Sequence, residues 1–478
     1  MLAASPFSDE SHTGEAIEAK TETALDCAEV SGLKHERLFF PVSDNGANMV
    51  AGWEPFGGGR CGVHTGQLSV MVFLEHQAIK PTRDKQKGIV AHFNKSTGVD
   101  GLNGLHKCQR SCQLPVHHPV STVATRWSSD HDQMEWFRYE QAAVQLYDVN
   151  HSRKAGDAYR QYQLGLEDWR ISEQSVAVLQ PVADWTQHMQ GTKYPTMPLA
   201  LPTVYELIDG MAPASPLNCS FAGVDPYVLQ PGEMHQGVLA ARTEMYKDWY
   251  RRWVTELRPA EAKKVYAIST LLHPFFKDYS FIDAYSFVDA SDKAWALGEL
   301  RSEWRFEWKN KPITTAAGPS HATAATPTPT PTAAPAPVPT PVPTPPTSGP
   351  DARPVAPGGK KVTLGSLLAG ATRVLGKKAI AAPSPTVVPV RDELEEYLSS
   401  PLETDMDLDL LKYWKLKETT WPKLAKMAKQ YLAAPFSSRA VSSHERVFSA
   451  AGKMHDDLRK SEKDSTLEHS LFAAFNIE

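Results

Sequence analysis

The 478-residue sequence contains little cysteine, and this scarcity excludes a scaffold held together by disulfides. The cysteines are Cys27, Cys61, Cys108, Cys112 and Cys219. An odd, sparse set in a chain of this size is typical of proteins in a reducing compartment. We therefore expect an intracellular protein.

Long apolar runs are also absent. Val70–Leu74 is as long as any of them and falls far short of the ~20 residues that span a bilayer. The first fifteen residues carry Asp9, Glu10 and Glu15 and few apolar side chains, so they do not form a secretory signal. The net charge of -5 excludes a uniformly basic nucleic-acid coat. We expect no membrane partner.

Proline is abundant in one place only. The chain has 37 prolines, and 15 of them fall between Pro312 and Pro357, which leaves 22 for the rest of the sequence. Because this tract has almost no large apolar residue, it predicts a disordered, extended linker. A ligand for an SH3 or WW domain is the alternative. The segment 364–382 that follows predicts either a short basic amphipathic helix or a mobile part of the linker.

The N-terminal part of the chain alternates helix and strand patterns. Apolar residues recur at helical spacing from residue 12 to 30, and residues 38–42 have the composition of a short buried strand. The sequence Ser43-Asp44-Asn45-Gly46 is a turn signature, and another helix pattern covers residues 64–79. This order indicates an α/β layer.

The remainder of the chain is predominantly helical in pattern. Trp249 and Trp253 are four residues apart, as are Trp304 and Trp308, so each pair lies on one helix face and predicts core packing. The C-terminal segment carries a broad apolar stripe made of Leu424, Met427, Ala428, Tyr431 and Leu432, followed by Val447 and Phe448. We interpret the stripe as a self-association surface, and an intramolecular core is the alternative.

Few residues suggest chemistry by themselves. Asp44 follows a strand, where carboxylates hold divalent cations such as Mg²⁺, although Asp-Asn-Gly is also an ordinary turn. Cys61 and His64 have the spacing of metal ligands but no second pair at a finger-like distance. Arg126 and Trp127 offer a cation beside an aromatic face, which suits an unstacked nucleotide. The alternative for that pair is a buried tryptophan beside a surface arginine.

The order of these motifs resembles the core of hAT-superfamily DNA transposases. The resemblance covers most of the chain except about residues 310 to 385, and its C-terminal part resembles the family's dimerisation region. It is carried by Val42 to Met49, Arg60 to His64, Thr125 to Ser129, Ser269 to Asp278, Trp421 to Leu424 and Ser443 to Gly452.

The resemblance implies a fold and a site. The fold is an α/β ribonuclease H-like core interrupted by a large all-α insertion domain. Catalysis in that family uses two aspartates and a glutamate that hold two divalent metal ions. Asp44 matches the second aspartate and Glu445 the glutamate, so both are the expected catalytic and metal-binding residues. Cys61 and His64 match the family's Cys-x-x-His element, and Arg126 with Trp127 its Arg-Trp element.

The expected division follows from this resemblance. Residues 1–129 form a partial core, and residues 130–311 form the helical insertion domain. Residues 312–390 form the linker with its short basic helix, and residues 391–478 form the dimerisation region that completes the core. The dimerisation residues are Leu424, Met427, Tyr431, Leu432, Val447 and Phe448.

The first aspartate of the family has no counterpart, since Asp9 lies in a Ser-rich tail and Asp26 lies inside a helix pattern. We therefore expect an incomplete core that lacks its first strands. The predicted protein is a catalytically inactive, nuclear, transposase-derived protein that dimerises and associates with DNA. The alternative is an active transposase that uses Mg²⁺ or Mn²⁺, its missing aspartate supplied by upstream sequence or by a partner subunit. A scaffold that displays the proline tract is a further alternative.

Overall fold

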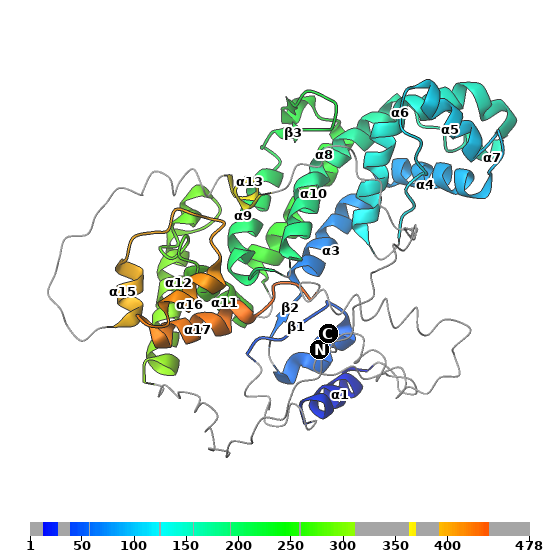
Figure 1. Ribbon diagram of the computed structural model, residues 1–478. Helices are drawn as coiled ribbons and strands as arrows, with labels where there is room; N and C mark the ends of the chain where they lie inside the picture. The colour runs from blue at the N-terminus through cyan, green and yellow to red at the C-terminus, as the bar shows by residue number, and fades with distance from the viewer. Residues whose placement is uncertain are drawn as a thin grey trace, which may run out of the picture.

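The computed structural model describes residues 13–26, 39–56, 58–123, 126–155, 157–191, 193–257, 260–310, 363–369 and 392–438. These residues are mostly helical (Figure 1). The elements of the first third are α1 (Gly14–Asp26), β1 (Val42–Ser43), α2 (Ala47–Trp53), η2 (Glu54–Phe56), β2 (Gly59–Arg60), α3 (Gly62–Leu74), α4 (Lys80–Lys95), α5 (Leu102–Ser111), α6 (Trp127–Ala155) and α7 (Asp157–Arg160).

Helices also dominate the rest of the described chain. Its elements are α8 (Leu166–Met189), η3 (Met197–Leu199), α9 (Ala200–Met211), β3 (Leu217–Cys219), β4 (Tyr227–Leu229), η4 (Pro231–Glu233), α10 (Gln236–Tyr250), η5 (Arg251–Thr255), α11 (Ala260–Leu271), η6 (Ser280–Ala284), α12 (Ala290–Glu303), η7 (Trp304–Trp308), α13 (Leu364–Leu367), α15 (Glu393–Ser399), α16 (Leu410–Lys417) and α17 (Pro422–Ala433). Between residues 130 and 310 the described residues are mostly helical, apart from β3 and β4, and a separate insertion domain stays a prediction.

The predicted N-terminal strand is shorter than its pattern indicates. Among the described residues it covers only Val42–Ser43, and it pairs in parallel with β2 in the register Val42 to Gly59 and Ser43 to Arg60. Pro41 precedes it and has no backbone N–H to donate, which confines proline to the margin of a strand. The Pro41 carbonyl instead accepts a hydrogen bond from the Gly59 N–H at 2.9 Å.

The strands of the described chain form two separate small sheets. One is the parallel pair β1 and β2, and the other is an antiparallel pair in which Leu217–Cys219 faces Tyr227–Leu229. Neither sheet has a third strand among the described residues. The ribonuclease H-like core therefore stays a prediction.

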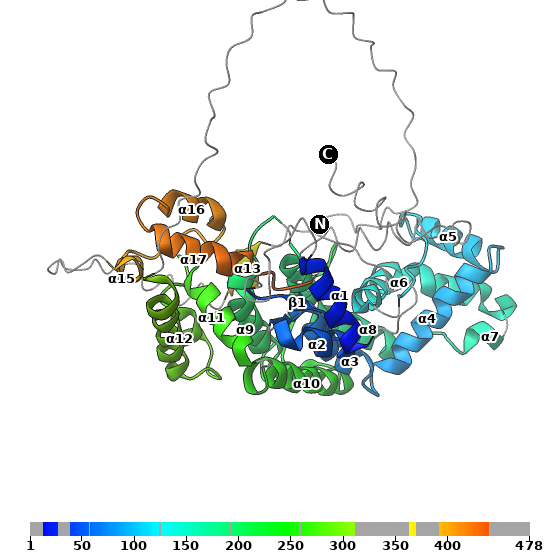
Figure 2. The same cartoon turned by 90° about the horizontal axis from the view of Figure 1, so that it is seen from below.

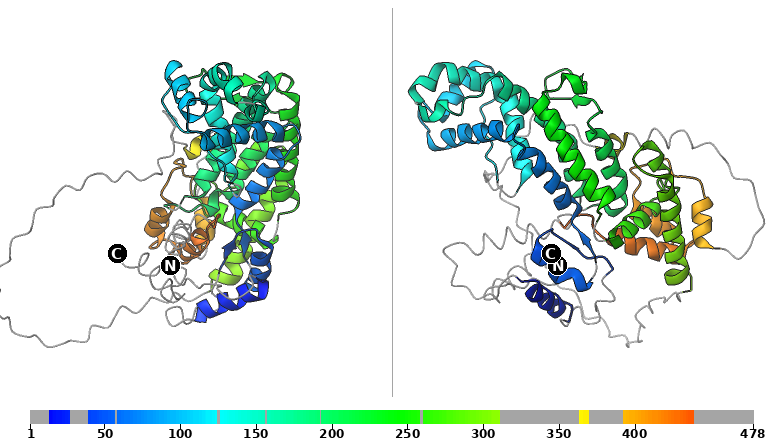
Figure 3. Two further views of the ribbon diagram at one scale, coloured as in Figure 1. Left: turned by 90° about the vertical axis from the view of Figure 1, so that its right-hand side faces the viewer. Right: turned by 180° about the vertical axis from the view of Figure 1, so that it is seen from behind.

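The helices form an elongated body with an arm at one end. Helix α10 packs along α3, and α8 packs against the long helix α6. Helices α4 to α7 form the arm, which lies at the opposite end of the molecule from α15 to α17 (Figures 1 and 3). The arm has its own core, made of Ile89, Val90, Phe93, Leu102, Leu105, Cys108, Trp136, Phe137, Ala143, Val144, Tyr147, Tyr159, Leu164 and Trp169.

The tryptophan pairs belong to the main core, as predicted from their spacing. Trp249 and Trp253 are buried at the end of α10 and in the π-helical turn η5, where Trp249 lies edge-on to Trp185. Trp304 and Trp308 are buried in the π-helical turn η7. None of the helices in the described part of the chain is both long and apolar enough to cross a bilayer.

The C-terminal helices α15 to α17 pack on the α11–α12 end of the body (Figure 2). The buried Lys277 ammonium donates to the carbonyls of Tyr397 at 2.7 Å and Ser400 at 2.6 Å. The Trp414 indole donates to the Leu272 carbonyl at 3.0 Å. These contacts join segments that are more than a hundred residues apart. The predicted linker at residues 312–357 lies outside the described residues, and of the segment 364–382 only the part up to Ala369 is described, with α13 at its start.

Candidate functional site

Asp44 lies directly after β1, where the sequence predicts it. Its Oδ1 accepts a hydrogen bond from the Gly46 N–H at 3.1 Å, which closes a turn of the kind that Asp and Asn favour. The Asn45 side chain donates to the Thr65 hydroxyl of α3 at 3.0 Å. Because β1 and β2 run parallel, Asp44 and Cys61 follow the two strands at the same edge of the sheet. The structure thus brings two of the predicted motifs together.

Cys61 and His64 lie at the start of α3. Cys61 is fully buried and is the residue that precedes the helix, a position that stabilises a thiolate. Burial by itself raises the pKa of the thiol, but hydrogen bonds from His64, Ser437 and Ser438 outweigh it and lower the pKa to about 6. The pair therefore forms a buried thiolate beside an imidazole near the tip of β2.

The C-terminal segment completes the surroundings of Cys61. The Ser437 hydroxyl lies 3.4 Å from the Cys61 sulfur, and the Ser438 N–H donates to the same sulfur at 3.4 Å. The Phe436 carbonyl accepts the Gly62 N–H at 2.9 Å, while its ring stacks on Trp253 with centroids 5.7 Å apart. Sequence reasoning missed Phe436 and Ser437, since neither lies in a motif with a spacing to recognise.

A cavity of about 170 Å³ opens beside the Asp44 turn. Its lining combines basic, polar and aromatic side chains from four parts of the chain. They are Asn45, Arg60, Thr65, Arg251, Arg252, Trp253, Glu256, Leu257 and Tyr266. The sequence signal for this site is the doublet Arg251-Arg252 just before the core residue Trp253, which is not part of any of the motifs described above.

The three arginines of the cavity differ in their partners. Arg251 and Arg252 both bind the Asp248 carboxylate, at 2.6 Å each, and Arg251 also binds Glu256 at 2.8 Å. Arg60 forms no ion pair within the described ranges. A bound anion could therefore pair with the Arg60 guanidinium without first displacing a protein carboxylate.

The described residues do not complete a metal site at Asp44. Glu445, the second expected ligand, lies outside the described residues. Nowhere in the described part of the chain do three or more His, Cys, Asp and Glu side chains gather in a way that would hold a metal ion. A two-metal site needs several carboxylates around both ions, and Asp44 is the one member of the expected set among the described residues.

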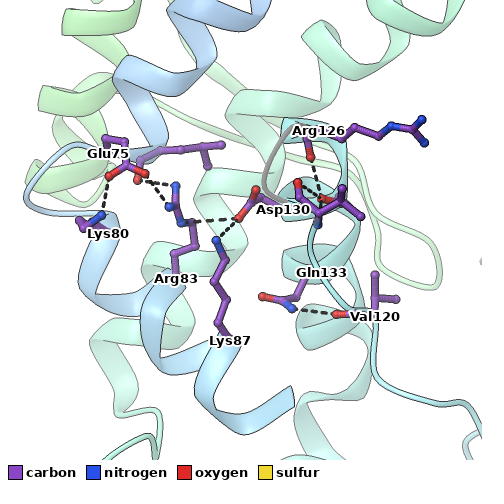
Figure 4. Close-up of polar contacts among 11 residues, drawn as sticks. Glu75, Lys80, Arg83, Lys87, Val120, Arg126, Asp130 and Gln133 are labelled. Carbon is purple, nitrogen blue, oxygen red and sulfur yellow. Dashed lines mark hydrogen bonds and ion pairs between the residues drawn. The ribbon is translucent and has the colours of Figure 1, made fainter. Parts of the chain in front are cut away.

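The Arg126–Trp127 element is not arranged for base stacking. Trp127 begins α6, is only 3% exposed and belongs to the main core, so neither face of its indole is open to a nucleotide. Arg126 is exposed and points away from the neighbouring ion pairs (Figure 4). The observed arrangement is a buried tryptophan beside a surface arginine, and the nucleic-acid role of the pair stays a prediction.

The ion pairs next to this element hold α4 on α6. Asp130 of α6 is buried and lies 2.9 Å from the Lys87 ammonium and 3.5 Å from the Arg83 Nε (Figure 4). Arg83 also binds Glu75 at 2.6 Å. Removing one partner of a buried ion pair leaves an uncompensated charge, which indicates a structural role for this cluster.

The predicted dimerisation stripe is covered by the same chain. Leu424, Met427, Tyr431 and Leu432 lie on α17 and are buried against the body, where Tyr431 packs edge-on against Phe39 at 4.5 Å. In the described chain these four side chains therefore form part of an intramolecular core, the alternative interpretation of the stripe, and their role in dimerisation stays a prediction. Val447 and Phe448 lie outside the described residues.

Comparison with known proteins identifies the C-terminal part of the chain. Residues 393–477 match the hAT family C-terminal dimerisation region. Three curated rice proteins (Oryza sativa subsp. japonica) are similar to the chain over short stretches: the zinc finger BED domain-containing proteins RICESLEEPER 1, 40% identical over 86 residues, RICESLEEPER 3, 41% over 93 residues, and RICESLEEPER 2, 38% over 86 residues.

These matches cover 17%, 19% and 17% of this chain in that order, and the chain spans only 12% of the length of each relative. The family match falls on the segment whose motifs carried the resemblance, from Trp421-Pro422 to the stretch that contains Glu445. Residues 393–477 of the chain are therefore similar to the hAT family C-terminal dimerisation region.

Proposed function

We propose that this chain is a transposase-derived protein that works by associating with a second copy of itself. The observation that carries the proposal is the match of residues 393–477 to the hAT dimerisation region. Its described part, residues 393–438, is anchored on the body by Lys277 and by the indole of Trp414. A partner that binds this region is thereby rigidly joined to the whole helical body.

The outer face of α16 is the part of this region that offers contact area. Leu411 and Leu416 are 51% and 68% exposed on a short helix, with Lys412 and Lys415 exposed between them. Exposed leucines within a dimerisation region are the residues that a second copy would cover. The partner is therefore expected on α16, and not on the buried stripe of α17.

Light scattering on the full chain tests the proposal. A dimer at micromolar concentration is expected, and the double variant Leu411→Glu, Leu416→Glu should shift it toward monomer because each change places a charge in the interface. Leu166→Glu is the matched control, since Leu166 is 82% exposed but lies on α8. A monomeric wild-type chain would contradict the proposed function, whereas a dimer that resists the double variant would contradict only the location.

A second proposed activity is association with DNA at the cavity beside Asp44. Support comes from Arg60, which has no ion pair among the residues that the structure describes, together with the polar groups of Asn45 and Thr65 in the same lining. A guanidinium of this kind suits a phosphate oxygen. Such a role would place the protein in the nucleus.

Fluorescence anisotropy with labelled DNA tests this activity. Arg60→Ala should weaken binding for all sequences alike and reduce the salt slope by about one charge. Arg305→Ala is the control, because Arg305, like Arg60, has no ion pair in the described chain but is exposed on η7, away from the cavity. Equal losses in the two variants would show non-specific attraction and count against the cavity.

Catalysis is proposed to be absent. The resemblance assigns only two of the three family carboxylates to this sequence, Asp44 and Glu445, and the rate of metal-dependent cleavage falls tenfold for each ~1.4 kcal/mol of lost stabilisation. Incubation with DNA and Mg²⁺ or Mn²⁺ should give no strand cleavage. Cleavage that disappears in Asp44→Asn would favour the alternative of an active transposase.

A further inference from the structure

Charge is unevenly distributed within the region that matches the hAT dimerisation model. Residues 393–409 contain seven Asp and Glu residues and no Lys or Arg, whereas residues 410–433 contain six Lys residues and one Glu. The sign of the charge changes at the start of α16. The stretch before this helix is therefore acidic, and the helix itself is basic.

The acidic side of this boundary is the loop that leads into α16. Asp405 and Asp407 are exposed, and neither forms an ion pair among the described residues. The Asp405 carboxylate accepts the backbone N–H of Asp407 at 3.0 Å, and Asp409 caps α16 by accepting the N–H of Lys412 at 3.0 Å. Because these donors are backbone amides, they do not neutralise the negative charge of the loop.

The basic side of the boundary is the outer face of α16 (Figure 2). Lys412 and Lys415 are exposed on it and form no ion pair in the described part of the chain. Leu411 and Leu416 flank them and are 51% and 68% exposed. Two positive charges thus lie three residues apart on one helix face. A partner that binds this face displaces none of the described residues.

These charges restrict how two such helices pair. A parallel pair would place like charges opposite each other along the whole contact. An antiparallel pair with Leu411 opposite the partner's Leu416 would place Lys412 opposite the partner's Lys415, which is again a pair of like charges. An antiparallel pair with Leu411 opposite its own copy instead brings Lys415 to the partner's Asp407. Only this last pairing joins opposite charges, and like charges across an interface are costly.

We propose that two copies pair through antiparallel α16 helices that meet at Leu411, with the acidic loop 405–409 of each copy against Lys412 and Lys415 of the other. This arrangement rests on the proposed self-association and specifies its geometry. A two-fold axis makes the same charged contact form twice. Charge complementarity favours a second copy over DNA at this face, because a phosphate backbone would meet the carboxylates of the loop beside the lysines.

Charge reversal in matched copies tests this arrangement. One full-length variant carries Lys412→Glu and Lys415→Glu, and the other carries Asp405→Lys and Asp407→Lys; Asp409 is unchanged because it caps α16. In analytical ultracentrifugation each variant alone should dimerise with a Kd about a hundredfold above that of the wild type, because like charges then face each other. An equimolar mixture should restore the dimer, since each variant then carries the charges that the other lacks.

A matched control reverses the same number of lysines elsewhere. Lys95→Glu with Lys107→Glu changes the net charge equally at exposed positions on the arm, at the opposite end of the molecule, and should leave the Kd unchanged. An equal loss in this control would show an effect of net charge and count against the arrangement. Circular dichroism checks that every variant is folded.

The outcomes separate this arrangement from self-association itself. A wild-type dimer that survives both charge-reversed variants would overturn the arrangement and leave self-association intact. The same conclusion would follow if each variant is monomeric and their mixture stays monomeric, because the two charged surfaces then do not face each other. A monomeric wild-type chain would overturn both the proposed function and the arrangement.

Discussion

The carboxylate of Glu393 accepts a hydrogen bond from the backbone N–H of Leu424 at 2.8 Å. The same oxygen accepts the N–H of Lys423 at 2.9 Å. Glu393 begins α15, and the two donors belong to the first turn of α17, so one side chain ties the start of one helix to the start of another. A carboxylate at this position also interacts favourably with the helix dipole.

Replacing this carboxylate should weaken the C-terminal region. Glu393→Ala leaves two first-turn N–H groups of α17 without their acceptor, and the expected loss is about 1–2 kcal/mol in the free energy of unfolding. Urea titration followed by tryptophan fluorescence measures it. Glu395→Ala on the same helix is the control, because its ion pair with Arg301 is exposed and should contribute little. Equal losses in the two variants would contradict the capping role.

Gly62 is expected to tolerate no side chain. A Cβ at this position would overlap the ring of Phe436, which is buried among Trp185, Trp253 and Tyr266. Gly62→Ala should therefore destabilise the protein by about 1–3 kcal/mol, as overpacking in a core does, and displace the segment that carries Ser437.

Gly298 provides the matched control for Gly62. It lies inside α12 and has open space where a Cβ would stand. Gly298→Ala should stabilise the helix by about 0.5–1 kcal/mol. Thermal unfolding of both variants measures these changes in stability. If Gly62→Ala leaves the stability unchanged, the Phe436 ring does not pack tightly against Gly62.

Acid should destabilise the protein through His273. Burial lowers the pKa of this imidazole to about 3 from its ordinary value of 6.5. Between these two values the unfolded chain binds a proton that the folded chain does not, so the free energy of unfolding falls as the pH decreases. The contribution of this one residue is about 1.4 kcal/mol per pH unit within that window.

His273→Asn isolates this effect, because an amide oxygen takes the place of Nδ1 as the acceptor of the Phe275 N–H. Unfolding free energies of both proteins measured from pH 7 down to about 4.5 should diverge below pH 6.5, with the variant less sensitive to acid. Parallel curves would mean that His273 is not the group responsible.

The Cys61 thiol should titrate near pH 6. The ultraviolet absorbance of thiolate should rise through that pH in the native protein, disappear in Cys61→Ser, and move to higher pH in His64→Phe, which lacks the imidazole. Cys219→Ser is the control, because burial raises the pKa of that thiol and its removal should leave the signal unchanged. A transition that persists in Cys61→Ser would assign it elsewhere.

Local patterns predicted the elements that depend on local physics. The turn at Asp44 follows from an Asp-Asn-Gly sequence whose side chain closes its own loop, and it lies at the end of a strand as expected. The two tryptophan pairs, each at helical spacing, predicted buried helix faces, and all four tryptophan side chains are buried. The dimerisation region was identified from its motifs, because their residue types and order are themselves sequence properties.

Local patterns could not predict which surfaces from distant parts of the chain pack against each other. An apolar stripe on α17 shows that something covers the helix, but the periodicity is the same whether the cover is the same chain or a second one. Trp127 has the same ambiguity, since a tryptophan before a helix is equally suited to a core and to a nucleotide. Burial in the folded chain decided both cases.

Residues near one another in the chain were enough to predict the helical character, the strand end at Asp44, the core tryptophans and the similarity of residues 393–477 to the hAT dimerisation region. Only the tertiary structure decided that Ser437 meets Cys61 across 376 positions and that arginines from two segments line one cavity. It also decided that α13 lies in a groove beside the loop before α16. Such contacts form when packed helices exclude water from their shared faces, and no short-range spacing encodes which faces meet.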